Sequence, residues 1–178
     1  KSLNACENPK ITNVNHLAKL EILNACGNCG INGAGIALCI NLKSLNASNN
    51  KIITNVNHLV NLEILDASGY CGINDVGIVQ CINLKSLYAS DNPKITNVNH
   101  LAKLEILDVS YNCIINDAGI MHCINLKSLN VSCNPKITNV NHLVKLEQLN
   151  IRSYYGFPNA GINDAGIMHC INLKSLNA

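Results

Sequence analysis

Pairs of leucines separated by two residues recur along the whole chain at nearly constant intervals. The pairs open at Leu20, Leu42, Leu62, Leu84, Leu104, Leu126, Leu146 and Leu173. Steps of 20 and 22 residues alternate between them, and the last step is 27 residues. A hydrophobic pattern with such a period is the signature of a repeat protein, in which each repeat packs on its neighbours. The repeating unit is a pair of unlike repeats, because residues 8–23 recur unchanged at 92–107.

Apolar and polar residues alternate in the first half of each repeat, as in "LKSLNASNN" at 42–50. This alternation predicts a short strand with Leu45 and Ala47 pointing inward and Ser44 and Asn46 pointing outward. One such strand cannot bury its apolar face alone. Stacking about nine of them predicts a parallel sheet, with the chain returns forming the other wall of the core.

The returns carry two further apolar columns, three and six residues before each opening leucine. The first reads Leu17, Cys39, Leu59, Cys81, Leu101, Cys123, Leu143 and Cys170, and the second reads Val14, Ile36, Val56, Ile78, Val98, Ile120, Val140 and Ile167. Both columns are predicted to point into the core. In the 22-residue repeats, Asn74 as a helix N-cap and Asp75 in the first turn predict a short helix. The shorter return "TNVNHL" predicts a 3₁₀-like turn.

The motif L-x-x-L-x-A/V-x-x-N/Y-x-x-I resembles the leucine-rich-repeat family, and the resemblance covers the whole chain. The 22-residue form, "CGINDVGIVQCIN" at 71–83, resembles the cysteine-containing class of F-box substrate receptors, and "NPKITNVNHLAKL" resembles the short class of internalins. The family implies an α/β solenoid with a parallel sheet on the concave face and short 3₁₀ or α returns on the convex face. The chain departs from the family at the third core position, where Ala5, Ala25, Ala47, Ala67 and Ala89 replace leucine.

The resemblance also implies a ladder of buried asparagines at the ninth position, which satisfy backbone groups where each strand turns away. The column reads Asn8, Asn28, Asn50, Asn92, Asn112 and Asn134. Tyr70 interrupts it, as a local rearrangement or as a contact residue. We expect residues 1–178 to form a single domain, a fragment without terminal caps because it begins and ends inside a repeat, with an insertion near 152–161.

Lysine and glutamate alternate without exception at the second position of every repeat. The column reads Lys1, Glu21, Lys43, Glu63, Lys85, Glu105, Lys127, Glu147 and Lys174. In a parallel sheet this places opposite charges on neighbouring strands, so we interpret the column as a structural ladder that fixes register. The histidine column, with His100, His122, His142 and His169 in consecutive repeats, is interpreted as a solvated outer surface; a metal stripe or a pH-responsive edge is the alternative.

Ten cysteines do not predict a disulfide framework here, because like members of their columns recur only in every second repeat. Most are interpreted as reduced core residues. Cys6, Cys26 and Cys29 stay open, since this trio could form a bridge or hold a soft metal. Two glycosylation sequons, at 46–48 and 130–132, fall on the outward strand face, where glycans would block it. Both arguments favour an intracellular, reducing compartment.

Composition excludes several functions. The net charge is +2, and only 13% of residues are charged, with 13 cations interleaved among 11 anions, which argues against nucleic-acid binding. No apolar run of membrane-spanning length occurs. Histidine, aspartate and serine lie on separate columns instead of converging, and no phosphate-binding glycine loop follows a strand. We therefore expect no enzyme, no cofactor and no metal site.

The sequence predicts a protein-interaction scaffold that binds a partner through the concave face and the aromatic insertion "IRSYYGFPNAG" at 151–161. The candidate contact residues depart from the repeat pattern. They are Tyr88, Asp91, Tyr111, Gln148, Arg152, Tyr154, Tyr155 and Phe157. The insertion could equally be a tolerated extension that caps the end of the stack. The partner is expected to be a protein, bound by a monomer. Two alternatives are the substrate-recognition segment of an F-box ubiquitin ligase subunit and a self-assembling, ice-binding or glycan-binding surface.

Overall fold

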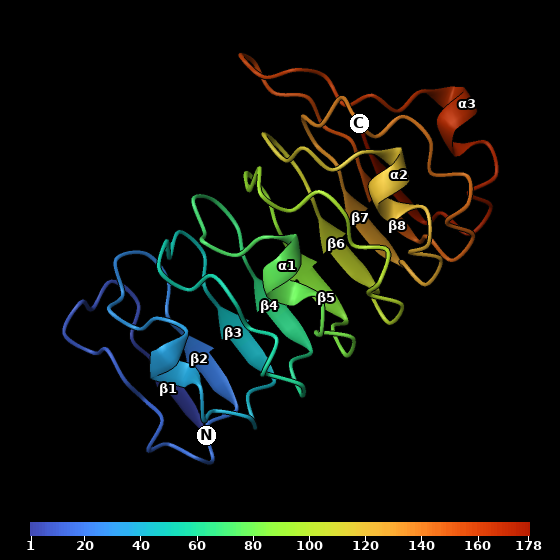
Figure 1. Cartoon of the computed structure of the whole chain (residues 1–178). Coiled ribbons are helices and arrows are strands. Elements are labelled where there is room, and N and C mark those ends of the chain that lie inside the picture. Colours follow the sequence, from blue (N-terminus) through green and yellow to red (C-terminus); the bar gives the residue numbers. More distant parts are fainter.

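A computed structural model describes all residues, 1–178, and forms one parallel sheet of nine strands in sequence order, β1 to β9 (Figure 1). The strands are β1 Ser2–Asn4, β2 Ile22–Asn24, β3 Ser44–Asn46, β4 Ile64–Asp66, β5 Ser86–Tyr88, β6 Ile106–Asp108, β7 Ser128–Asn130, β8 Gln148–Asn150 and β9 Ser175–Asn177. Each turn of the chain contributes one strand, and the two termini lie at opposite ends of the stack (Figure 1). The predicted solenoid is confirmed.

The register places equivalent residues of successive repeats side by side. Leu23 pairs with Leu45, and Leu45 pairs with Leu65, across β2, β3 and β4. Every column of the sequence is therefore a row that runs across the sheet. The inward rows join the apolar columns of the returns in one core of 45 buried residues. The alanines at the third core position are fully enclosed, with at most 2% of their surface exposed.

Short helices occur only in the returns of the 22-residue and 27-residue repeats, on one side of the sheet (Figure 1). They are η1 Ala34–Ile36, α1 Asp75–Ile78, α2 Asp117–Ile120 and α3 Asp164–Ile167. The predicted N-cap is confirmed, since the side chain of Asn74 accepts a hydrogen bond from the backbone N–H of Gly77. The first return forms only a 3₁₀ turn, and there Gly33 occupies the place of Asp75.

The 3₁₀-like turn predicted for the 20-residue returns is confirmed as an i→i+3 hydrogen bond, and it does not extend into a 3₁₀ helix. These segments contain single turns only, such as the bond from the N–H of Leu59 to the carbonyl of Val56 at 2.9 Å. Before that turn, Asn55 accepts the N–H of Asn57 at 2.9 Å. This Asx turn uses the backbone N–H locally and limits the helical stretch.

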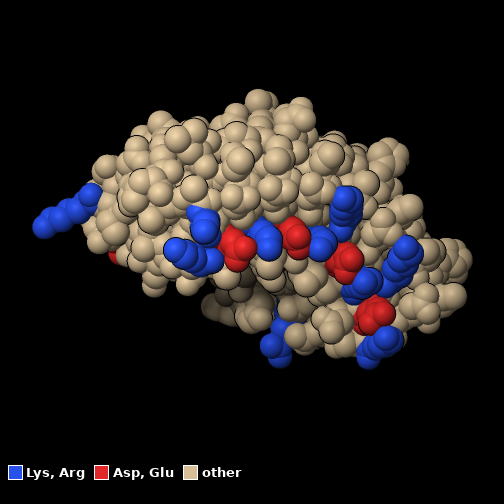
Figure 2. All heavy atoms as spheres, turned by 90° about the horizontal axis from the view of Figure 1, so that it is seen from below, with Lys and Arg blue, Asp and Glu red and all other residues tan.

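A row of alternating charges follows the edge where the strands begin (Figure 2). Each glutamate contacts the lysine of the following repeat, at 3.6 Å for Lys43 with Glu21 and 2.8 Å for Lys85 with Glu63. The neighbouring lysines lower the pKa of Glu63 below its ordinary value. The predicted charge ladder is confirmed, and its members are exposed side chains.

Buried asparagines form a ladder only in alternate repeats. Asn92 is fully buried, and its Nδ2 donates to the carbonyls of Ala67 at 2.7 Å and Ile73 at 3.2 Å, in the preceding repeat. Asn50 and Asn134 make the same contacts. In the 22-residue repeats the prediction was wrong: the asparagines at this position are exposed, and the buried residue is the cysteine that follows them. Exposed Tyr70 therefore interrupts no buried ladder.

Two asparagine rows on the returns escaped the sequence analysis. In one row, Nδ2 of each residue donates to a carbonyl of the preceding repeat; its members are Asn41, Asn61, Asn83, Asn125 and Asn172. In the other, both side-chain groups bond the following repeat; its members are Asn15, Asn57, Asn99 and Asn141. In the sequence each row is visible as a column of asparagines. A column of polar residues fits a solvent-exposed surface as well as a set of structural hydrogen bonds, so the sequence alone does not predict their role.

Two of the three cysteines left open by the sequence are bonded to each other, and the third is free. Cys6 and Cys26 form a disulfide that joins the ends of β1 and β2, with their Cα atoms 4.6 Å apart. Cys29 and seven other cysteines are free and buried. Burial raises the pKa of Cys71 and Cys81 to about 11. These thiols are therefore protonated at neutral pH and pack as small apolar groups.

Candidate binding surface

The face of the sheet opposite the returns, the predicted concave face, is here called the open sheet face. It presents the first and third residue of every strand. The first-residue row contains exposed isoleucines in alternate strands: Ile22, Ile64 and Ile106 have 51%, 43% and 36% of their surface exposed. Serines stand between them. Ile64 and Ile106 flank Ser86 in the register, and Ser86 is only 8% exposed. The isoleucines thus form an apolar row, with a buried serine between Ile64 and Ile106.

The third-residue row consists of asparagine or aspartate in every strand except β5. Its side chains have a structural task, because Oδ1 accepts the backbone N–H of the residue two positions later. Asp66 accepts from Ser68 at 3.0 Å, and Asp108 accepts from Ser110 at the same distance. This Asx turn directs the chain away from the sheet after each strand.

Tyr88 occupies this row in β5, and it cannot make the turn contact. Its side chain is 37% exposed on the open sheet face. In the register it lies between Asp66 of β4 and Asp108 of β6. No lysine or arginine pairs with either carboxylate, since all five ion pairs of the protein lie in the charge ladder. An aromatic ring between two carboxylates without cations is a site that favours a basic group.

The turn after each of β1 to β7 holds one residue in the left-handed region, which glycine adopts most easily. Asp91 has φ 60° and Tyr111 has φ 59°. The carboxylate of Asp91 accepts a hydrogen bond from Nδ2 of Asn112 in the next repeat, at 2.7 Å. Asp91, a predicted partner-binding residue, therefore joins two repeats, a contact that its departure from the repeat pattern does not predict.

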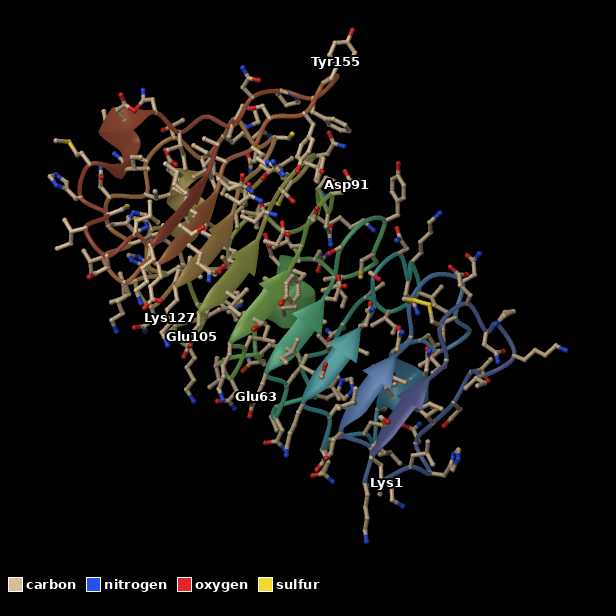
Figure 3. All side chains as sticks on the ribbon, turned by 180° about the vertical axis from the view of Figure 1, so that it is seen from behind. Lys1, Glu63, Asp91, Glu105, Lys127 and Tyr155 are labelled. Carbon is tan, nitrogen blue, oxygen red and sulfur yellow. A yellow bond between two sulfur atoms is a disulfide. The ribbon has the colours of Figure 1, made fainter.

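Tyr111 packs against the insertion. Its ring stacks on Tyr154 with centroids 6.1 Å apart and meets Phe157 edge-on at 5.1 Å. The desolvation that accompanies this packing raises the pKa of the Tyr111 hydroxyl. We call Tyr111, Tyr154 and Phe157 the aromatic cluster. It lies at the edge where the strands end, and the fully exposed Tyr155 projects from the tip of the insertion (Figure 3).

The remaining two candidates lie apart from the cluster contacts. Gln148 is the first residue of β8 and accepts a hydrogen bond from Ser128 Oγ at 3.4 Å. Arg152 is exposed, and its backbone carbonyl accepts the N–H of Cys133 at 3.0 Å. The structure thus brings together three of the eight predicted contact residues, places Tyr88 among carboxylates, and leaves the rest dispersed along the open sheet face and its edge.

Three of the four histidines in the "TNVNHL" returns are half-buried and bonded. Nε2 of His58, His100 and His142 lies 3.1 to 3.2 Å from a backbone carbonyl of the preceding repeat. His16, His122 and His169 are exposed, as the sequence predicted for the whole column. No three His, Cys, Asp or Glu side chains converge in a way that could hold a metal ion.

The hollows of the surface differ in their linings, and one at the N-terminal end has Leu3, Leu17 and Leu20 among its lining residues. A depression of about 590 Å³ at the charge-ladder edge is lined by lysine, glutamate and asparagine without an apolar side chain. No helix of the protein is long and apolar enough to cross a membrane.

One strand per turn, inward leucines, asparagine ladders and short returns together define a leucine-rich-repeat solenoid. Solved structures agree with this fold. An internalin (inlF) of Listeria monocytogenes is 24% identical, with a TM-score of 0.67 over 94% of this chain and 51% of that one. Internalin C2 (inlC2) of the same species is 21% identical, with a TM-score of 0.73 over 98% of this chain and 79% of that one.

A third similar structure is the functional domain of InlJ from Listeria monocytogenes, described as including a cysteine ladder. It is 18% identical, with a TM-score of 0.66 over 98% of this chain and 40% of that one. The chain spans about half the length of the first of these structures. No protein-family model and no curated protein sequence matches the chain. At these identities the comparisons establish the fold.

Proposed function

We propose that the chain is a non-enzymatic protein-interaction scaffold that binds a protein partner through its open sheet face and the aromatic insertion. The observation that carries this proposal is Tyr88. Asparagine or aspartate makes the turn contact after β1 to β4 and after β6 to β8, whereas tyrosine at this position exposes an aromatic ring between two carboxylates. Aromatic side chains on a rigid surface are the commonest anchors of protein interfaces.

The aromatic cluster supports the same proposal. Tyr111 holds Tyr154 and Phe157 in place, so that the insertion presents Tyr155 from a fixed base. Preorganised aromatic residues lose little conformational entropy on binding, which favours affinity. A solenoid suits this task because its rigid rows can vary independently.

The experiment is affinity capture from cells with the purified chain and three variants. Tyr88→Asn restores the residue type of the row, and Tyr154→Ala/Phe157→Ala removes the insertion anchors. Val76→Ala is the matched control: Val76 is exposed on the return side, and alanine stands there in other repeats. We expect the partner to be lost from the first two variants and retained by the control. Equal recovery by all proteins would overturn the assignment of this surface.

The F-box and the self-assembling, ice-binding or glycan-binding alternatives stay predictions. Reading the full open reading frame for an F-box tests the first. Measuring molecular mass over a concentration series, together with ice-recrystallisation and glycan-array assays, tests the second. A monomer that is inert in these assays is the result that our proposal expects.

An intracellular, reducing location also stays a proposal. Eight buried free thiols support it, whereas the Cys6–Cys26 disulfide would be reduced in such a compartment. Acid-trapped protein from its native cells, denatured and alkylated, should then contain all ten cysteines as thiols. A count lower by the two bridged cysteines would place the protein in an oxidising compartment.

A further inference from the structure

We infer that the open sheet face between β2 and β6 is a docking site for an amphipathic α-helix that carries an apolar residue at every seventh position and a lysine or arginine beside the central one. This inference rests on the proposed function and specifies the chemistry of the partner. It follows from two neighbouring rows of the face, one apolar and one acidic.

The spacing of the apolar row matches a helix. Ile22, Ile64 and Ile106 lie in β2, β4 and β6, so consecutive isoleucines are two strands, about 9.6 Å, apart. Seven residues of an α-helix rise about 10.5 Å. A helix inclined by about 24° to the row brings its seventh residues into step with the isoleucines. Across two such intervals the apolar positions drift by about 40°, which stays within the stripe of about 100° that an amphipathic helix presents.

The acidic row gives the charge of the partner. Asp66, Tyr88 and Asp108 are adjacent across β4, β5 and β6, directly beside the row of isoleucines. Their donors are all uncharged: Asp66 accepts from the N–H of Ser68, and Asp108 accepts additionally from Asn130 Nδ2 at 2.9 Å. The lysines of the charge ladder lie at the strand-start edge and pair with glutamates (Figure 3). A guanidinium or ammonium over the Tyr88 ring is therefore flanked by two carboxylates without cationic partners.

An extended proline-rich peptide is the competing occupant, because its three-residue turn rises about 9.3 Å. Such peptides dock their prolines in grooves lined by aromatic residues. Here the row consists of isoleucine and serine, and Tyr88 lies in the neighbouring row. Aliphatic anchors at helical spacing favour the helix.

The test is fluorescence anisotropy with labelled synthetic peptides of about 24 residues, long enough to form helix in an alanine-rich background. The probe peptide carries leucine at three positions seven apart and arginine beside the middle leucine. One control peptide has the same composition with its leucines on different sides of the helix. A second replaces arginine by glutamine, and a third is proline-rich with leucine at every third position. We expect the probe peptide to bind about tenfold more tightly than each control.

Variants of the protein localise the binding. Ile64→Ser introduces the residue that alternate strands already carry in this row, and it should weaken the probe peptide about tenfold. Ile52→Ser changes an isoleucine of similar exposure, 48%, on a turn outside the sheet, and should leave binding unchanged. Asp66→Asn/Asp108→Asn keeps the turn contacts and removes the charge. It should abolish the advantage of arginine over glutamine. Thermal unfolding checks that each variant is folded.

Four results would overturn the inference: no peptide binds; the scrambled, glutamine or proline-rich peptide binds as well as the probe; Ile64→Ser has no effect; or Asp66→Asn/Asp108→Asn leaves the advantage of arginine unchanged. None of them touches the broader proposal, which is decided by partner capture with Tyr88→Asn and the insertion variant. If a partner is captured and is lost from those variants, but none of the peptides binds, the proposed scaffold function is retained and the proposed helix-docking site is rejected.

Discussion

The ring of Tyr111 meets the ring of Phe157 edge-on at 5.1 Å, although Tyr111 stands in a left-handed turn with φ 59°. In other repeats this position holds Gly27 and Gly69, which adopt the same conformation without a side-chain penalty. Tyr111 thus combines an unfavourable backbone conformation with a favourable contact to the insertion. At this residue the aromatic contacts favour the observed structure, and the left-handed backbone conformation disfavours it.

Replacing Tyr111 by glycine should separate these two effects. The substitution removes the aromatic contacts and also relieves the left-handed backbone, so we expect no loss in melting temperature. The insertion should become mobile, and limited proteolysis within residues 153–160 should proceed several-fold faster. Tyr70→Ala, at an exposed residue far from the insertion, serves as the control. A stable protein with an unchanged cleavage rate would show that Tyr111 does not hold the insertion.

Removing a buried asparagine should be far more damaging than removing an exposed one. Asn92→Ala leaves the carbonyls of Ala67 and Ile73 without their donor and the N–H of Lys94 without its acceptor. We expect the free energy of unfolding to fall by about 2–4 kcal/mol. Asn112→Ala removes only an exposed contact and should stay within about 0.5 kcal/mol of the parent. Urea titrations measure both, and equal losses would contradict the alternate-repeat ladder.

The buried thiols predict a loss of stability at alkaline pH. Burial raises the pKa of four cysteines to about 11, from an ordinary value of 9.0; they are Cys71, Cys81, Cys113 and Cys123. The folded protein therefore holds these protons more tightly than the unfolded chain. Their contribution to stability is complete below pH 9 and is lost as pH rises toward 11, by about 1.4 kcal/mol per pH unit for each thiol.

Urea titrations between pH 8 and 11 test this slope, with Cys81→Ala as the matched variant that removes one of the titrating groups. Above pH 9 the free energy of unfolding of this variant should fall less steeply with pH, by the contribution of one thiol. At neutral pH, iodoacetamide should modify the buried thiols only after unfolding. A stability that stays constant up to pH 11 would refute the prediction.

The charge ladder should respond to salt and to acid. Lys85→Glu places three glutamates on neighbouring strands, so we expect a lower melting temperature that recovers partly in high salt as the repulsion is screened. In the parent protein the lowered pKa of Glu63 and Glu105 stabilises the fold above pH 4.5, and this contribution should be lost as the pH falls below it. Lys10→Glu, outside the ladder, is the control. A salt-independent change in Lys85→Glu would exclude the repulsion.

The strands, their parallel order and the core rows could be predicted from the sequence, because the repeat period and the alternation of apolar and polar residues recur in every repeat. The wrong predictions concern positions where either of two neighbouring residues could be the buried one. Asn28 and Asn112 share the column of the buried Asn92, yet the cysteine that follows each of them points inward instead. A column of identical letters could not reveal which neighbour is buried, because that choice depends on the backbone of the turn.

The candidate contact residues depart from the repeat pattern of the sequence. Such a departure does not show whether a residue contacts a partner or another part of the same chain. Tyr88 was correctly placed on the sheet face. Tyr111 and Phe157 were selected separately, and only the three-dimensional path of the insertion brings them together. The Cys6–Cys26 bridge had been one of two open possibilities, because adjacent strands allow it but do not require it.

The alternation of Lys85 between Glu63 and Glu105 has a consequence for how such an array can change its length. Deleting one repeat would set lysine beside lysine or glutamate beside glutamate, and it would also bring two turns of the same kind into contact. Deleting two consecutive repeats preserves every junction. Whole repeats can therefore be gained or lost without a mismatched junction only in pairs of 42 residues, which is the separation of the identical "NLKSL" segments at 41–45 and 83–87.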